Sequence, residues 1–288
     1  MAYTVTFWGT RGSIPTPGAH TARYGGNTSC VAVSGLPDQL VILDAGSGIR
    51  LLGTQLARAA TSAMNLDILL SHTHWDHIQG LPFFQPLHGK NNSVRIYGAA
   101  QAGVPLEQIL DRQMDPVVFP VPLKALAADL KITEVVSGSF EIDGFRVEAY
   151  RLRHQGTTLG YKLVPVRGGH TIAYLTDNEL GDGGSYDVGP GWREGLVRFL
   201  GGVDTLIHDG MYTEAMIESR SGWGHSTPEQ AIDLAREAGC QRLVLFHHEP
   251  EHDDAAIDAL VEGARRYAKQ RAPKLAVEAA MEGMALTL

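Results

Sequence analysis

The spacing of apolar and polar residues predicts a chain of many short strands interspersed with helices. Short apolar runs and two-residue alternation are typical of strands, whereas apolar residues three and four apart are typical of helices. The predicted strands are Tyr3–Trp8, Val31–Ser34, Leu40–Asp44, Leu66–Leu70, Val94–Tyr97, Ile132–Val136, Phe145–Leu152, Thr158–Val164, Thr171–Thr176, Asp204–Ile207, Leu243–Phe246, Leu275–Val277 and Ala285–Leu288. The predicted helices are Ile49–Ala60, Pro105–Gln113, Trp192–Leu200 and Asp253–Gln270. This mixture favours the α/β class.

Turn signals mark where several of these elements begin and end. A further helix is predicted to start after Thr227, which fits the N-cap, because Pro228 follows it and Gln230 stands at the capping-box position. Gly239 ends this helix. The segment Gly35–Asp38 is the expected connection between two strands.

No composition shift or linker divides the chain, so a single domain over residues 1–288 is predicted. The pattern loosens at about residues 84–130, where a covering segment or lid is expected. Within this range Asp115–Leu123 is apolar but broken by prolines, which excludes a central strand. A cover beside a site and a surface loop packed on the core are equal alternatives for it.

Composition and charge narrow the function classes. The 288 residues are 44% hydrophobic, enough for a large core, and their formal net charge of −8 argues against an electrostatic nucleic-acid binder. Cys30 and Cys240 form no CxxC pair and favour a reducing compartment. No signal peptide is apparent and no apolar stretch approaches the ~18 residues of a membrane span, so we expect a soluble, cytoplasmic protein without a membrane partner.

The densest chemistry lies in the stretch LDILLSHTHWDHIQG. His72, His74, Asp76 and His77 follow the apolar run Leu66–Leu70 within a few residues. Loops after the carboxyl ends of strands are where α/β sheets commonly place their sites. His72 and His74 point the same way in an extended segment, whereas Asp76 and His77 lie beyond a turn and can face a second ion. Imidazole and carboxylate suit zinc, and also iron or manganese, so a metal site is predicted.

Further candidate ligands follow other predicted strands. They are Asp44, His154, Asp177, His208, Asp209 and His247. Each alone is a weak signal, because a single His or Asp after a strand is usually a loop or core residue. Together with the HxHxDH motif they form a strong set.

This set resembles the metallo-β-lactamase superfamily, whose signature matches His72-Thr73-His74-Trp75-Asp76-His77 in full. The resemblance implies an αββα sandwich of two mixed β-sheets flanked by helices, with a dinuclear metal site at one edge. It implies one ion on His72, His74 and His154, a second on Asp76, His77 and His247, and Asp177 as the bridge. The implied cofactors are two divalent ions, Zn²⁺ first, with Mn²⁺ or Fe²⁺ as alternatives.

The resemblance also implies residues that act behind the ligands. Asp44 resembles the superfamily's Asp that orients a ligand His by accepting its other N–H. A turn-forming Asp in the sequence DAGSG is its equal alternative. His208 is expected to lie behind the ligands in a similar way.

Two segments resemble the ribonuclease Z and PhnP-like phosphodiesterases within that superfamily. His225-Ser226-Thr227 resembles the HST motif of this branch, and Leu206–Gly210 is placed like its HEAT motif. The resemblance implies a dyad in which His225 protonates the leaving group and Asp209 orients His225. Asp209 stands where the family has Glu, so its carboxylate is one methylene shorter. Asp76 is implied to orient the nucleophile as well as to bind metal; for His225, a position at the start of a helix without chemistry is the alternative.

Two features favour a small substrate. Ribonuclease Z carries a long, basic, Gly/Pro-rich arm between the positions of His154 and Asp177, and here a short hairpin joins them. Together with the acidic charge this predicts a small-molecule phosphodiester, such as a cyclic nucleotide or cyclic ribose phosphate, and no long nucleic acid. Arg11 and Arg23, in Gly-containing segments, are predicted to bind phosphate through forked N–H groups; pairing with a structural carboxylate is their alternative.

The sequence therefore predicts a metal-dependent phosphoric diester hydrolase that activates water with two ions. A thioester, lactone or β-lactam hydrolase with the same metals is the main alternative, and a di-iron redox protein and a non-catalytic sensor domain are further ones. A homodimer is expected by analogy with the fold. The sequence leaves the substrate and the native metal open.

Overall fold

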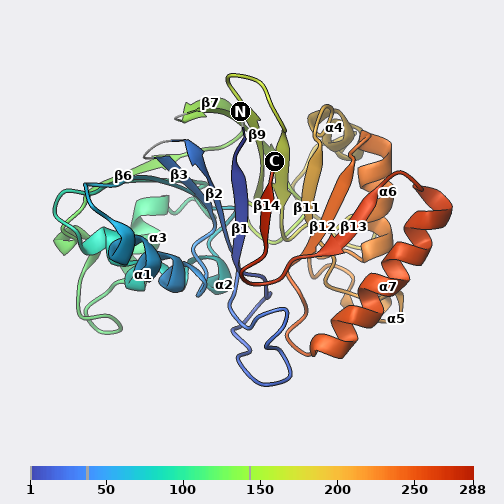
Figure 1. Cartoon of the computed structure of the whole chain (residues 1–288), viewed down its shortest axis with the longest axis horizontal. Helices are drawn as coiled ribbons and strands as arrows, with labels where there is room; N and C mark the ends of the chain where they lie inside the picture. The colour runs from blue at the N-terminus through green and yellow to red at the C-terminus, as the bar shows by residue number, and fades with distance from the viewer. Residues whose placement is uncertain (1, 37–38, 143) are drawn as a thin grey trace.

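Two seven-stranded β-sheets form the centre of the computed structural model, which describes residues 2–36, 39–142 and 144–288. The strands of the first sheet are Thr4–Gly9 (β1), Cys30–Leu36 (β2), Gln39–Leu43 (β3), Asn65–Leu69 (β4), Ser93–Gly98 (β5), Asp129–Glu134 (β6) and Ala285–Thr287 (β14). The strands of the second are Gly138–Ile142 (β7), Phe145–Arg151 (β8), Leu159–Pro165 (β9), Ile172–Leu175 (β10), Thr205–Asp209 (β11), Arg242–Phe246 (β12) and Ala276–Ala279 (β13). Their spatial orders are β14-β1-β2-β3-β4-β5-β6 and β13-β12-β11-β10-β9-β8-β7 (Figure 1).

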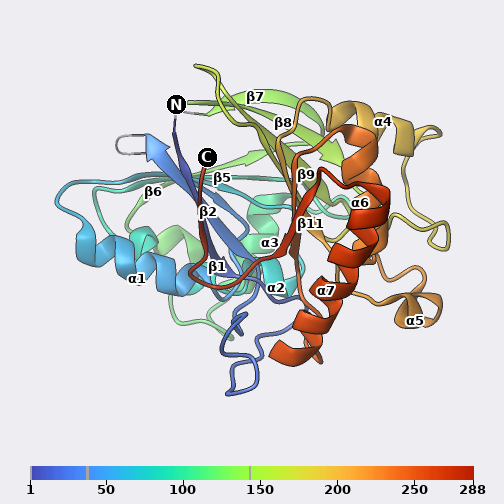
Figure 2. The ribbon, with the colours of Figure 1, turned by 45° about the vertical axis from the view of Figure 1, so that its right-hand side comes forward.

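Helices cover the outer face of each sheet. The helices are Ile49–Ala59 (α1), Trp75–Ile78 (α2), Leu106–Gln113 (α3), Trp192–Phe199 (α4), Glu214–Ile217 (α5), Pro228–Ala238 (α6) and Asp254–Arg271 (α7), with short 3₁₀ turns at Leu81–Phe83, Gln85–His88, Leu123–Ala125 and Glu218–Arg220. Helices α1 and α3 lie on the first sheet, and α4, α6 and α7 lie on the second (Figure 2). The predicted αββα sandwich is confirmed. The capping box predicted at Thr227 is present at the start of α6.

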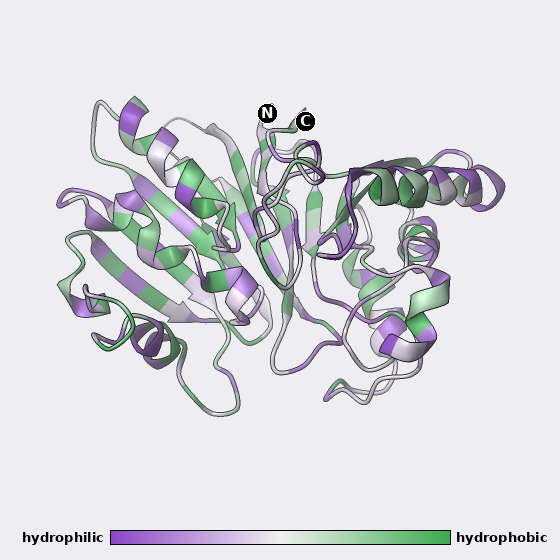
Figure 3. Cartoon of the chain, turned by 90° about the horizontal axis from the view of Figure 1, so that it is seen from below, coloured by the Kyte–Doolittle hydropathy of each residue, from purple (hydrophilic) through white to green (hydrophobic). Residues whose placement is uncertain are grey.

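Three apolar clusters hold the four layers together. The cluster between the sheets joins Val33 and Val41 of the first sheet to Tyr161 and Val244 of the second, all of them buried. The other two clusters lie between each sheet and its helices. Figure 3 shows the resulting alternation of hydrophobic and hydrophilic residues along strands and helices. Strands such as β10 and β12 are covered on both faces, which explains their continuous apolar sequences.

The sheets bring the carboxyl ends of several strands to one edge of the sandwich. Strands β3 to β6 are mutually parallel, and so are β10 to β13. Strand β8 points the same way as β10, because each is antiparallel to β9. At this edge the amide of Leu159 donates to the carbonyl of Ser71 at 2.9 Å, and the Tyr161 hydroxyl donates to the carbonyl of Leu70 at 2.7 Å. These bonds join the two sheets directly behind the HxHxDH motif.

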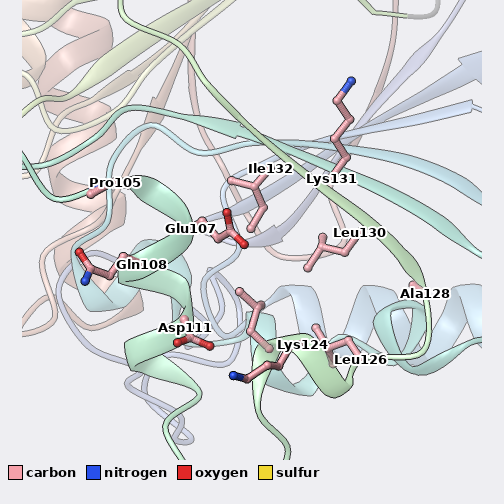
Figure 4. Close-up of a pocket in the computed structure, with 11 residues that line it drawn as sticks. Pro105, Glu107, Gln108, Asp111, Lys124, Leu126, Ala128, Leu130, Lys131 and Ile132 are labelled. Carbon is pink, nitrogen blue, oxygen red and sulfur yellow. The ribbon is translucent and has the colours of Figure 1, made fainter.

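The predicted covering segment, residues 84–130, belongs in part to the first sheet and its helix layer, because it contributes β5 and α3. A pocket of about 770 Å³ lies between α3 and β6, and no predicted metal ligand lines it (Figure 4). Asp115–Leu123 contains no strand, as its prolines predict, and the Val117 side chain in it is 92% exposed. Closure of this segment over a site stays a prediction.

The sequence pattern misses β7 and the short helices α2 and α5. Strand β7 is largely exposed and has only five residues, GSFEI, with little apolar alternation. Helix α2 has a single turn, which is too short to show a helical period. Pro37 and Asp38 of the predicted connection lie outside the described residues.

A single domain over the whole chain stays a prediction, and the core between the sheets predicts that both sheets unfold in one step. Phe7 on β1 is fully buried and its ring centroid lies 6.1 Å from that of Phe246 on β12. We expect Phe7→Ala to lower the free energy of unfolding by about 3–5 kcal/mol, since it removes packing from both sheets. Calorimetry should show one transition at a lower temperature, with equal calorimetric and van't Hoff enthalpies.

The matched control is Val166→Ala, because Val166 is 61% exposed. This change should alter the unfolding free energy by less than about 0.5 kcal/mol. A second transition that stays at the wild-type temperature in Phe7→Ala would show that the sheets belong to separate units.

Candidate functional site

The HxHxDH motif begins just past the carboxyl end of β4. His72 and His74 lie in the extended segment after the strand, and His74 is the N-cap of α2. Asp76 and His77 lie within this one-turn helix. The turn separates the two pairs of side chains, so that the motif supplies ligands to two adjacent groups.

The structure gathers the seven predicted metal ligands into these two groups. The first consists of His72, His74, His154 and Asp177, and the second consists of Asp76, His77, Asp177 and His247. Within each group the candidate ligand atoms lie within 4.8 Å of one another. The division is the one that the family resemblance implies, and Asp177 is common to both groups.

The two oxygens of Asp177 face different groups. Its Oδ2 lies 3.6 Å from Nε2 of His72 and 3.5 Å from Nε2 of His154. Its Oδ1 lies 3.3 Å from Nε2 of His77 and 3.2 Å from Nε2 of His247. A carboxylate with one oxygen toward each group has the geometry that a bridging ligand requires.

The chemistry of these residues fits divalent cations. The Nε2 atom of His72 is buried and has no hydrogen-bond partner among the described residues. Unpaired buried polar atoms are costly, and a cation on them removes the cost. Burial lowers the pKa of His72 well below its usual value, and burial also lowers the pKa of His154 to about 4. Both imidazoles are therefore neutral near pH 7, which is the form that binds metal.

Three residues of the site adopt a left-handed backbone conformation directly after or close to the end of a strand. Asp44 has φ 61°, Asp177 has φ 55° and His247 has φ 60°. This conformation is uncommon for residues other than glycine, and Asp tolerates it better than most. Such outliers cluster at functional sites, where the surrounding structure holds them in place.

The carboxylate of Asp44 orients His77. Its Oδ2 lies 2.8 Å from Nδ1 of His77, and it accepts hydrogen bonds from the hydroxyls of Ser71 at 2.8 Å and Tyr174 at 2.7 Å. The Nε2 atom of His77 is thereby directed toward Asp76 and Asp177. Asp44 is also left-handed, so its geometry is compatible with both predictions for it, an orienting residue and a turn residue, and its effect on a bound metal stays a prediction.

Asp209 and His225 form the pair that the HEAT-like and HST-like segments predict. The Nδ1 atom of His225 lies 3.0 Å from Oδ2 of Asp209, so the shorter carboxylate still reaches it. The amides of Asn178 and Ser226 donate to the two oxygens of Asp209 at 3.1 Å and 3.0 Å. Burial alone would lower the pKa of His225, but the charge and hydrogen bond of Asp209 raise it above its usual value.

His208 lies behind this pair rather than behind the metal ligands. Its Nδ1 lies 2.7 Å from the carbonyl of Asp209, and its Nε2 lies 3.1 Å from Nδ2 of Asn178. Burial lowers the pKa of His208. Its position supports Asn178, whose backbone amide binds Asp209.

Arg11 is not available to a substrate. Its side chain is fully buried, and its Nε donates to the carbonyl of Gly25 at 2.8 Å. Its Nη1 donates to the carbonyls of Glu249 at 3.1 Å and His252 at 2.5 Å. The predicted phosphate contact of Arg11 is therefore wrong, and its hydrogen-bond partners are backbone carbonyls rather than a carboxylate. It joins the N-terminal loop to the segment that follows His247.

Arg23 lies on the surface against α7. Its guanidinium binds the carboxylate of Asp258 and donates to the carbonyl of Asp254 at 2.9 Å. This is the carboxylate pairing that was the alternative for Arg23. The structure therefore corrects its predicted role as a phosphate ligand.

Sequence reasoning misses several residues that support the site. They are Ser71, Tyr174, Glu179 and Tyr212. Tyr174 and Tyr212 are aromatic residues in or near apolar strands, where the sequence offers no sign of a polar partner. Glu179 follows Asp177 closely in the sequence LTDNE, and this acidic spacing is the one local signal that points to it.

Comparison with known proteins establishes the family. Residues 40–248 match the family model described as the Beta-lactamase superfamily domain. The chain belongs to the beta-lactamase superfamily. This confirms the resemblance that the HxHxDH motif carries. A Ribonuclease Z of Methanosarcina acetivorans is 27% identical over 87% of this chain and 88% of its own, and a Ribonuclease BN of Escherichia coli is 27% identical over 90% and 93%.

Solved structures share the fold over nearly the whole chain. The metallo-beta-lactamase fold protein YhfI from Bacillus subtilis has a TM-score of 0.70 at 20% identity and covers 100% of this chain and 99% of its own. A diphosphatase from the PhnP family has a TM-score of 0.67 at 18% identity, covering 100% and 98%. The family match and the ribonuclease relatives support a metal-dependent hydrolase, so the chain is an enzyme of this kind.

The ribonuclease relatives correct the prediction that a long nucleic acid is excluded. Proteins named Ribonuclease Z and Ribonuclease BN match most of this chain, which points to nucleic-acid substrates rather than to a small phosphodiester alone. The error has a physical reason, because net charge describes the whole surface. Bound cations would be the largest local charges at the centre and would invert the acidic character there.

Among the described residues, none of the helices combines the length and the apolar character that a membrane span requires. The cytoplasmic location and the homodimer stay predictions.

The shared position of Asp177 predicts that both ions depend on it. Asp177→Asn keeps the shape of the side chain and tolerates the left-handed backbone, but removes the negative charge. We expect the metal content, measured by elemental analysis after reconstitution, to fall from two ions to one or fewer per chain. Asp187→Asn is the control, because the Asp187 side chain is 97% exposed. Two ions retained in Asp177→Asn would exclude it as the bridge.

The contact between Asp44 and His77 predicts a weaker metal site in Asp44→Asn. The neutral amide cannot hold the N–H of His77 as strongly as the carboxylate, so we expect metal affinity to fall about 10–100-fold. Competition with a chelator measures this. Unchanged affinity would leave only the turn role for Asp44.

Proposed function

We propose that this protein is a phosphodiesterase that hydrolyses phosphodiester bonds of nucleotides, RNA included, with two divalent ions. The observation that carries the proposal is the position of His225 over both ligand groups. Its ring centroid lies 5.2 Å from that of His154 in the first group and 5.1 Å from that of His247 in the second. A phosphoryl group held between the groups would therefore have a proton donor beside it.

The ligand residues would hold the two ions as the geometry divides them. His72, His74 and His154 would take one ion, Asp76, His77 and His247 would take the other, and Asp177 would bridge them. When bound, two such cations neutralise phosphoryl charge and lower the pKa of water. The nitrogen and oxygen ligands favour Zn²⁺, with Mn²⁺ or Fe²⁺ as the alternatives.

His225 is proposed as the general acid. Asp209 binds its Nδ1, so Nε2 is the ring nitrogen that would carry the proton that passes to the leaving oxygen. The raised pKa of His225 favours the protonated form that this step needs. Asp76 has a different role, because its Oδ2 accepts from the amide of Ser13 at 2.8 Å and lies 3.1 Å from His247. It is held as a ligand whose second oxygen can orient a water molecule.

The dyad favours a phosphodiester over a thioester, lactone or β-lactam. A phosphodiester with an alkoxide leaving group gains most from protonation, because an alkoxide is a strong base. Relatives named as ribonucleases support the same bond type. No comparable feature of the described residues favours the other substrates.

The proposal predicts a leaving-group dependence for His225→Ala. With the metal-loaded enzyme we expect kcat on a dinucleotide, which has a poor leaving group, to fall about 10²–10⁴-fold. On bis-p-nitrophenyl phosphate, whose leaving group needs no proton, the loss should stay below about tenfold. His88→Ala is the control, because His88 is exposed and its Nε2 binds only the carbonyl of Pro82 among the described residues.

Equal losses on both substrates would remove His225 as the acid.

A chelator should abolish both activities, and Zn²⁺ or Mn²⁺ should restore them. A wild-type enzyme that hydrolyses nitrocefin but neither phosphodiester would overturn the proposed function.

A further inference from the structure

An exposed aromatic side chain lies directly beside the candidate centre. Trp223 is 54% exposed, yet the next residue, Gly224, contacts the ligand His154. Nδ1 of His154 lies 3.1 Å from the carbonyl of Gly224. A side chain built on Gly224 would collide with this imidazole, so the backbone beside Trp223 packs as closely as it can against the site. The exposed indole is therefore placed where it can contact a molecule bound at the candidate centre.

The loop that carries Trp223 is held from both sides by one buried carboxylate. Glu179, which is 2% exposed, accepts hydrogen bonds from the amides of Gly222 at 2.9 Å and Gly224 at 3.0 Å. It also accepts from the hydroxyl of Tyr186 at 2.6 Å. The two glycines have φ of +82° and +86°, values that side chains strain to reach. Trp223 is thus presented to solvent on a preorganised loop, which reduces the entropy lost on binding.

A continuous stack leads from Trp223 into the site. The Arg220 guanidinium lies 4.8 Å from the centre of the Trp223 ring and 5.2 Å from the centre of the Tyr212 ring. Tyr212 is 1% exposed, and its ring meets His225 edge-on at 5.5 Å. Arg220 also lies 3.7 Å from the carboxylate of Glu249, which helps to fix its plane. The stack therefore links the solvent-exposed indole to the proposed general acid.

We propose that Trp223, backed by Arg220, is a stacking platform for the nucleobase of the leaving nucleoside. The inference rests on the proposed function, because it assigns the base-binding side of that phosphodiesterase. Bases of all kinds stack on indole rings, and an adjacent guanidinium strengthens such stacking and attracts phosphate. Trp223 and His225 are two residues apart, so their Cα atoms are at most about 7 Å apart. A nucleoside whose oxygen accepts a proton from His225 is therefore within reach of the indole.

The test uses two dinucleotides that differ only on the leaving side, where one carries adenine and the other is abasic. Loss of one stacked base costs about 1–3 kcal/mol, so Trp223→Ala should raise KM for the adenine dinucleotide about 5- to 150-fold. KM for the abasic dinucleotide should change less than about twofold. Trp223→Phe should restore most of the affinity, because a ring remains.

Trp75→Ala is the matched control, since Trp75 is the more exposed indole at 79% and follows the ligand His74. It should leave the ratio of the two KM values as in the wild type. Equal KM increases on both dinucleotides in Trp223→Ala, no increase on either, or a selective increase in Trp75→Ala instead would overturn the inference.

A binding measurement separates this inference from the proposed function. If the metal-loaded wild type hydrolyses neither dinucleotide, the proposed function fails, and calorimetry with adenosine 5′-monophosphate and ribose 5-phosphate then tests the platform. Tighter binding of the nucleotide that is lost in Trp223→Ala supports the platform on its own. Equal binding of the two ligands, or a preference that survives the substitution, overturns it.

Discussion

The carboxylate of Asp44 is the interaction on which the site depends, because it joins both sheets at the edge where the ligands meet. It follows β3 of the first sheet and binds the hydroxyl of Tyr174, which belongs to β10 of the second. The same carboxylate binds Ser71 and His77 after β4. One buried carboxylate therefore links the strand ends of both sheets, and its burial is tolerable because Ser71, His77 and Tyr174 all contact its oxygens.

The two groups of candidate ligands also bury polar and charged side chains. A smaller share of their polar atoms is paired within the protein than is the case for Asp44. Seven candidate ligands concentrate imidazoles and carboxylates in a mostly buried space, where some buried ring nitrogens have no hydrogen-bond partner among the described residues. Charges of the same sign repel one another in this buried space, and burial disfavours the charged form of each side chain. The fold contributes the rigid strand ends that keep the side chains together, and cations would supply the charge that the chain itself does not.

The sequence predicts two kinds of site residue. Some are adjacent in one motif, and others come just after strands whose carboxyl ends lie at the same edge. His72 to His77 are contiguous, and His154, Asp177 and His247 each come within three residues of a strand whose carboxyl end reaches the same edge. Tyr174 and Glu179 could not be found this way, because their roles depend on partners far along the chain. Arg11 shows the opposite error, since a guanidinium suited to phosphate is equally suited to buried carbonyl oxygens. The net charge of the chain wrongly indicated that a long nucleic acid is excluded. Net charge is a sum over the whole surface, and the site is only a small part of that surface.

The five residues from Trp223 to Thr227 contact the candidate metal ligands, supply the proposed general acid and begin a helix. Gly224 contacts His154 from behind, and His225 faces both ligand groups. The amide of Ser226 binds Asp209, its hydroxyl donates to the carbonyl of Asn178 at 2.5 Å, and Thr227 caps α6. The capping box at Thr227 fixes the backbone where this loop enters α6. The bonds that hold the dyad therefore lie within two residues of the cap at Thr227, so a change in the cap is expected to affect the position of His225.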